Sequence, residues 1–307
     1  MRLGVVGMLP PDFRTINSDH LKAIQSLKLT GACFHGGADL LFNVTTAECQ
    51  KVKQLYADMN MDLVQMGINY RECLFDPDPA VRDGIIRVID RGIEVARELG
   101  AHVALIRPGS LNPAGAYAPS RKNHTPECME RLIGSLRRVA DKAEREGQTI
   151  VIETYALTIM DSPETNAAIV KAVGSDRIQI VLDYVNHFQS LAQVYNSADR
   201  INHIFDVMGP VCPVGHCKDI SVGNEFALHL NETLPGQGEL DLGTVLRRWH
   251  ALHPDGYMLL EHAPDDKMPH DLSLEDQKLF ALAPHKGYAF AARNVFRFAE
   301  EAGVPIY

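Results

Sequence analysis

Val151-Ile152-Glu153, Val181-Leu182-Asp183, Val214-Gly215-His216 and Leu259-Leu260-Glu261 are four short apolar runs that each end in a polar residue. Each run has the length and apolar character of a buried parallel strand. The terminal polar residues lie 30, 33 and 45 residues apart, which suits one strand and one helix per repeat. In a closed barrel of such repeats, the carboxyl ends of all strands meet on one face, where active sites form. The sequence therefore predicts two glutamates, one aspartate and one histidine at a common site.

Four further apolar runs complete a set of eight predicted strands, at residues 3–8, 31–35, 62–67, 102–107, 149–153, 178–183, 213–218 and 257–261. Helical patterns lie between them, with starts marked by Ser or Thr before Pro-Glu at residues 125–127 and 162–164. Alternating strands and helices allow a closed (β/α)8 TIM barrel or an open doubly wound sheet. No GxGxxG follows the first strand, and polar ends on four consecutive strands favour closure. We therefore predict an α/β protein with a (β/α)8 TIM barrel, as a single domain over residues 1–307.

The composition restricts the class of partner. Apolar residues make up 46% of the chain and the formal net charge is −9, which argues against a nucleic-acid partner. No apolar run has the length of a membrane span or a secretory signal. Six scattered cysteines show no disulfide framework, so we expect reduced thiols and a cytoplasmic protein.

The four strand-end residues form a ligand set of three carboxylates and one imidazole. Oxygen-rich ligation favours Mn²⁺ or Mg²⁺, while the imidazole keeps Co²⁺, Fe²⁺ and Zn²⁺ as alternatives. No thiolate accompanies them, which argues against a structural zinc site. We therefore expect one divalent ion, with Mn²⁺ favoured, bound by Glu153, Asp183, His216 and Glu261.

Three motifs carry a resemblance to a known family: Leu182-Asp183-Tyr184-Val185-Asn186-His187, His216-Cys217-Lys218-Asp219 and Pro235-Gly236-Gln237-Gly238-Glu239-Leu240-Asp241. Together with the four strand-end residues, they resemble the xylose isomerase-like TIM barrels of the sugar phosphate isomerase/epimerase superfamily. The resemblance implies that Glu153 and Glu261 are both metal ligands and acid/base residues on the two sides of the substrate. It implies that Asp183 and His216 are ligands only. The implied reaction removes a proton beside a carbonyl through a metal-stabilised enediolate.

Five other residues are candidates for substrate binding. Several family members place a histidine three residues after the aspartate ligand; here Asn186 stands there and His187 follows, and we expect both near the substrate. Lys218 follows His216 by two, so it either reaches a substrate oxygen or pairs with Asp219 or another strand-end acid. Arg107 and His35 end their predicted strands facing the site, although an ion pair for Arg107 or a structural hydrogen bond for His35 is an alternative.

The leading hypothesis is a divalent-metal-dependent isomerase or epimerase of a sugar or keto-sugar. The alternative is a lyase or dehydratase that uses the same site, as in inosose dehydratases or in cleavage of a 3-keto-glycoside. It stays open because ketose 3-epimerases usually place an arginine shortly after the histidine ligand, and residues 217–224 contain none. An endonuclease-IV-like phosphodiesterase fits the acidic charge poorly, and a non-catalytic sugar-binding barrel fits the intact ligand set poorly. The expected partner is a carbohydrate, with an unphosphorylated one mildly preferred, and a homo-oligomer is left open.

Overall fold

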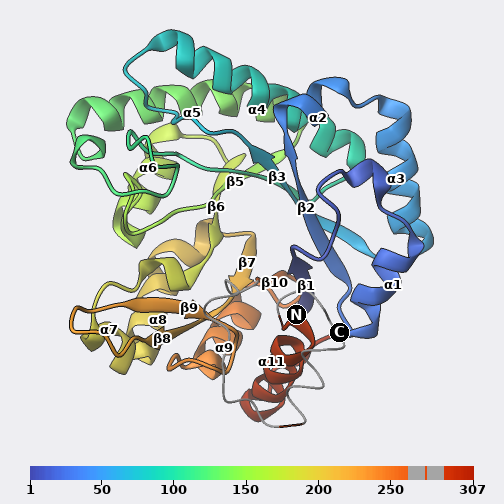
Figure 1. Ribbon diagram of the computed structural model, residues 1–307, viewed down its shortest axis with the longest axis vertical. Coiled ribbons are helices and arrows are strands. Elements are labelled where there is room, and N and C mark those ends of the chain that lie inside the picture. The colour runs from blue at the N-terminus through green and yellow to red at the C-terminus, as the bar shows by residue number, and fades with distance from the viewer. Residues whose placement is uncertain (262–273, 275–286) are drawn as a thin grey trace.

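The computed structural model describes residues 1–261, 274 and 287–307, and it contains a closed barrel of eight parallel strands (Figure 1). β1 pairs with both β2 and β10, which closes the ring in the order β1-β10-β7-β6-β5-β4-β3-β2. The strands are β1 Arg2–Val6, β2 Gly31–Gly37, β3 Asp62–Asn69, β4 Val103–Ile106, β5 Thr149–Ile152, β6 Ile178–Leu182, β7 Val214–Cys217 and β10 Tyr257–Leu260. The predicted (β/α)8 barrel is confirmed, and the ends of the eight predicted strands differ from these by one or two residues at most.

Helices surround the strands on the outside of the barrel (Figure 1). They are α1 Ser18–Ser26, α2 Ala38–Asn43, α3 Thr46–Asp58, α4 Pro79–Leu99, α5 Pro126–Glu146, α6 Pro163–Val173, α7 Leu191–Tyr195, α8 Ser197–Met208, α9 Leu242–Leu252 and α11 Tyr288–Ala302. The predicted starts are confirmed, because the hydroxyls of Thr125 and Ser162 accept backbone N–H groups at the first turns of α5 and α6. Within the described ranges, no helix is both long enough and apolar enough to cross a bilayer.

The barrel interior is filled by side chains from all eight strands, including Val151, Val181, Val214 and Leu259. A larger apolar layer lies between the strands and the helices. Because side chains alternate across a strand, the residue two positions after an interior residue also faces inward. The inward-facing residues that follow these four are Glu153, Asp183, His216 and Glu261. The strand period of two therefore aims all four polar side chains into the carboxyl-terminal mouth of the barrel.

A two-stranded antiparallel hairpin, β8 Asp219–Val222 with β9 Leu230–Thr233, follows β7 and was missed by the sequence analysis. The buried carboxylate of Asp219 anchors it by accepting the backbone N–H groups of Ile220, Gly236, Gly238 and Leu240. Burial raises the pKa of Asp219 to about 6, although these four hydrogen bonds favour the charged form. A Cβ at Gly238 would lie 2.4 Å from Asp219 Oδ1, so this close approach requires glycine. One side chain thus holds the hairpin and the loop at residues 235–241 together.

Asp219→Asn is expected to lower the free energy of unfolding by ~2–4 kcal/mol, since buried N–H donors left without acceptors cost about 1–3 kcal/mol each. The asparagine would direct an NH₂ group at donors that now bind a carboxylate oxygen. Urea denaturation checks this. The matched control is Asp241→Asn at the N-cap of α9, where asparagine caps as well as aspartate and should leave stability nearly unchanged. Equal stability of the Asp219 variant and the control would contradict this anchoring role.

Candidate metal centre

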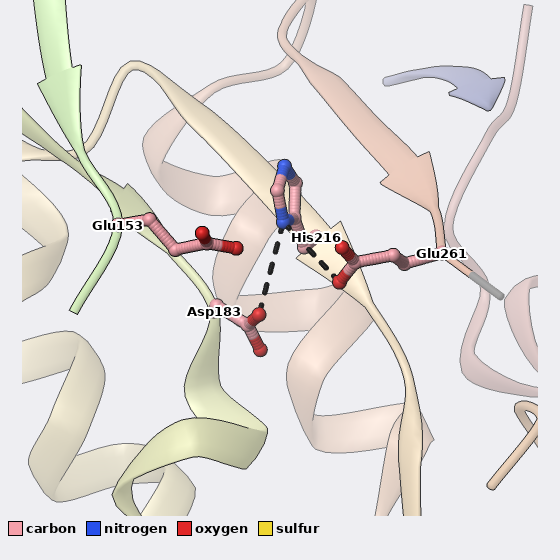
Figure 2. A group of neighbouring side chains, drawn as sticks. All are labelled: Glu153, Asp183, His216 and Glu261. Atoms are coloured by element: carbon pink, nitrogen blue, oxygen red, sulfur yellow. Dashed lines mark ion pairs between the residues drawn. The ribbon is translucent and has the colours of Figure 1, made fainter. Parts of the chain in front are cut away.

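Four side chains converge at the mouth of the barrel, as the sequence predicted. Glu153, Asp183, His216 and Glu261 each offer a ligand atom, and these atoms lie within 4.8 Å of one another (Figure 2). His216 Nδ1 is 3.7 Å from Asp183 Oδ2 and 3.5 Å from Glu261 Oε2. The two glutamates come from opposite sides, with their carboxylates directed towards each other (Figure 2). Segments from four strands therefore form one compact cluster.

The donor atoms of this cluster fit a divalent cation. Glu153, Asp183 and His216 are buried, and both oxygens of Asp183, Nδ1 of His216 and Oε2 of Glu261 make no hydrogen bond of regular geometry within the described ranges. Asp183 Oδ2 and Glu261 Oε2 are paired with the Lys218 ammonium, but Asp183 Oδ1 and His216 Nδ1 have no such partner in the described part of the chain. Buried polar atoms without hydrogen bonds are costly, and a bound ion would give both atoms a partner. The other imidazole nitrogen of His216, Nε2, lies 3.2 Å from Gln65 Oε1, which turns Nδ1 towards the carboxylates. Gln65, buried on β3, was missed by the sequence analysis.

The charges within the cluster shift the protonation of its members. Burial lowers the pKa of His216, but the carboxylates of Glu261 and Asp183 outweigh it and raise that pKa to about 10. Burial and the nearby charge of Glu261 raise the pKa of Glu153. Burial also favours neutral Glu261, but the cations Lys218 and His216 dominate and hold its pKa well below the usual value. The two glutamates therefore differ in their electrostatic environment, although both belong to the same site.

Lys218 lies inside the cluster, with its side chain only 3% exposed. Lys218 Nζ is 2.8 Å from Asp183 Oδ2, 2.8 Å from Glu261 Oε2 and 3.0 Å from Glu232 Oε1. Burial alone would lower the pKa of Lys218, but the surrounding carboxylates hold it well above its usual value. Of the two readings offered by the sequence, the ion pair is present, formed with these three acids. A contact between Lys218 and a substrate remains a prediction.

The family of this chain is identified by a match to a known protein family. Residues 21–281 match the xylose isomerase-like TIM barrel family. The chain belongs to this family. No curated protein matches it in sequence.

Solved structures of xylose isomerase-like TIM barrels share the fold of this chain. D-psicose 3-epimerase from Clostridium cellulolyticum H10 superimposes with a TM-score of 0.69 at 13% identity, covering 98% of this chain and 99% of that one. The 3-keto-D-glucoside 4-epimerase from E. coli gives 0.66 at 14% identity, covering 95% and 99%. A family member from Mycobacterium smegmatis in complex with magnesium gives 0.68 at 15% identity, covering 98% and 97%. At sequence identities this low, the structural similarity establishes the common fold alone.

A hydrogen-bonded chain of side chains reaches Glu153 from the loop after β4. The Tyr117 hydroxyl donates to Glu153 Oε2 at 2.6 Å, and Arg107 Nη1 donates to the Tyr117 oxygen at 2.9 Å. Arg107 Nη2 also donates to Asn69 Oδ1 at 3.1 Å. Arg107 thus reaches Glu153 through Tyr117, and a contact between Arg107 and a substrate remains a prediction. Tyr117 belongs to the loop at residues 109–123, so part of this loop reaches the carboxyl-terminal face of the barrel.

The remaining candidates lie in different environments. Asn186 lines a cavity beside the cluster, together with Glu232. His187 is fully buried, shares a hydrogen bond with the Thr154 hydroxyl at 3.1 Å, and has its pKa lowered to about 4 by burial. The His35 ring packs over Gly67, where a Cβ would lie 1.9 Å from the imidazole. Substrate contacts for Asn186, His187 and His35 remain predictions, and cavity geometry favours Asn186.

Proposed function

We propose that this xylose isomerase-like TIM barrel is a divalent-metal-dependent isomerase or epimerase that acts on a sugar or keto-sugar. The observation that carries the proposal is the convergence of Glu153, Asp183, His216 and Glu261 within 4.8 Å at the mouth of the barrel. Epimerases of psicose and of a 3-keto-glucoside among the structural neighbours support an enzyme of this kind. Mn²⁺ is the favoured ion, and Mg²⁺ is the first alternative because one neighbour contains magnesium.

The arrangement of the two glutamates suits proton transfer beside a carbonyl. One carboxylate removes a proton from carbon on one side of the substrate, and the other returns a proton from the opposite side or to the adjacent carbon. Asp183 and His216 complete the ligand set without taking part in proton transfer. When bound, a divalent ion at this set supplies Lewis-acid stabilisation of the charge that develops on the substrate oxygen. Tyr117 orients Glu153, and Lys218 orients Glu261.

Elimination by the same site is the second candidate. A lyase or dehydratase removes the same proton and must then protonate the leaving group. The Tyr117 hydroxyl beside Glu153 and the Lys218 ammonium beside Glu261 are two donors of the required kind. Residues 217–224 also lack the arginine that is usual in ketose 3-epimerases. The mass of the product separates the two reactions, since isomerisation conserves it and elimination does not.

The experiment is a screen of the Mn²⁺-loaded protein in deuterated water against ketoses, keto-inositols and 3-keto-glycosides. We expect one substrate class to gain solvent deuterium at a carbon beside the carbonyl, measured by mass spectrometry and NMR. A chelator should abolish the exchange, and added Mn²⁺ should restore it. Exchange that survives complete metal removal would contradict the proposed function, as would a protein that binds no divalent ion.

Tyr117→Phe should lower kcat in this exchange assay by about tenfold or more, since a hydrogen bond to a charged group contributes about 1.5–3 kcal/mol. We expect little change in KM or in Mn²⁺ affinity, because Tyr117 orients Glu153 through a hydrogen bond. The control is Tyr195→Phe, which alters an exposed tyrosine on α7. A Tyr117 variant with the kcat of the control would remove Tyr117 from the mechanism.

A further inference from the structure

A cavity of about 600 Å³ lies beside the candidate metal centre, and we call it the hairpin cavity. Its walls come from residues 155–157 after β5, residues 185–189 after β6 and the β8–β9 hairpin. Pockets of ~300–1,000 Å³ typically hold drug-sized ligands, and a single sugar ring is much smaller than that. The cavity therefore has room for more than the part of a sugar that would react at the cluster.

The inner end of the hairpin cavity is polar and adjoins the cluster. Glu232 lines it and contacts Lys218, whose ammonium contacts Asp183 and Glu261. Asn186 also lines the cavity; the residue is 7% exposed, and its Nδ2 makes no hydrogen bond to any described residue. A buried donor that faces a cavity is suited to an oxygen of a bound molecule. The inner end therefore offers one donor and one carboxylate acceptor, the pair that a sugar's hydroxyl groups require.

The rest of the hairpin cavity is mostly apolar, with Tyr155, Gln189 and His229 as its other polar residues. Seven of its twelve lining residues are aliphatic residues, alanine or phenylalanine, and none is arginine or lysine. Leu157 and Leu228 are 55% and 50% exposed, so two leucines of the lining present apolar surface to solvent. Phosphate and carboxylate groups are bound by arginine and lysine, and the one acid of this lining would repel them. The lining therefore favours an uncharged, apolar group over a phosphorylated sugar.

We infer that the hairpin cavity binds an apolar substituent of the substrate, so that the substrate is a glycoside with an alkyl or aryl aglycone. Asn186 and Glu232 hold hydroxyl groups of the sugar at the inner end, and Leu157 and Leu228 pack against the aglycone. The reacting carbons then lie at Glu153 and Glu261. This inference rests on the proposed function and adds the class of substrate to it.

The test compares methyl and 4-nitrophenyl glucosides, as both anomers, with glucose 6-phosphate. These probes lack the reactive ketone, so their binding to the Mn²⁺-loaded protein can be measured by calorimetry without turnover. We expect a 4-nitrophenyl glucoside to bind about tenfold or more tightly than its methyl counterpart, the effect of burying one aromatic ring. Leu228→Asp should remove most of this preference.

Phe226→Asp is the matched control, because Phe226 is fully exposed on the same hairpin and does not line the cavity. It should keep the preference for the aryl glucoside. Equal affinity for aryl and methyl glucosides, no binding of either aryl anomer, or an equal loss in the two hairpin variants would overturn the inference. Tighter binding of glucose 6-phosphate would also overturn it. None of these outcomes would contradict the proposed function. The proposed function fails separately, if the protein does not bind Mn²⁺ or if deuterium exchange is absent.

Discussion

Glu153→Gln is expected to reduce the rate of deuterium exchange by about a thousandfold, within the ~10²–10⁴ range for loss of a general acid or base. Glutamine keeps an oxygen that can bind a metal ion but cannot accept a proton from carbon at neutral pH. Glu153 also loses its charge, so the variant should bind Mn²⁺ somewhat more weakly. We therefore expect a large fall in the rate even when the variant is saturated with Mn²⁺.

The measurement is the exchange rate at saturating metal, with metal affinity determined by calorimetry. Glu239→Gln provides the control, because Glu239 is exposed in the loop before α9. If the Glu153 variant exchanges at the rate of the control, Glu153 takes no part in proton transfer. If full activity returns with excess Mn²⁺, Glu153 is a ligand only, and Glu261 must be the base.

Lys218→Met should produce the largest loss of stability, and only in metal-free protein. The ammonium lies 2.8 Å from both Asp183 and Glu261, and all three side chains are mostly or fully buried. Removing one partner of a buried ion pair costs about 3–5 kcal/mol, because the remaining charge is left uncompensated. Here the uncompensated charges are carboxylates that repel each other. Urea denaturation in the presence of a chelator should show this loss.

The same substitution should strengthen metal binding. A divalent ion held by Asp183 and Glu261 shares their oxygens with the Lys218 ammonium, and the two cations repel each other. Replacing Lys218 with methionine removes this repulsion, so the association constant for Mn²⁺ should rise by about tenfold or more. Lys51→Met, at an exposed position on α3, serves as control for both measurements. Weaker Mn²⁺ binding, or no loss of stability without metal, would show that Lys218 is not a counter-ion of this cluster.

Most of the barrel could be predicted because strands that are buried on both faces consist of consecutive apolar residues. The cluster followed from the same pattern, since Glu153, Asp183, His216 and Glu261 each come two residues after an interior residue. The hairpin was not predictable in this way. β9 is Leu230-Asn231-Glu232-Thr233, a polar stretch with no apolar run to mark it. Glu232 was missed for this reason.

Residues supplied by loops or short helices were also difficult to place. Tyr117 lies in an irregular segment, so no periodicity aims its hydroxyl at Glu153. Asn186 and His187 are neighbours in η3 (Tyr184–His187), a 3₁₀ turn with three residues per turn, where adjacent side chains point in clearly different directions. One lines the hairpin cavity and the other enters the core. Sequence spacing alone could not decide which of the two would do so.

The hairpin has a fixed base and an exposed connecting segment. Its base is fixed by Asp219, and its strands remain paired as far as Val222 and Leu230. The segment between them carries Phe226 and Leu228, which are exposed. On the inference that the hairpin cavity binds the aglycone, mutations in this segment would change which substrates bind and would leave the four strand-end residues as they are. Exchanging residues 223–229 between relatives is accordingly a natural starting point for redesigning selectivity.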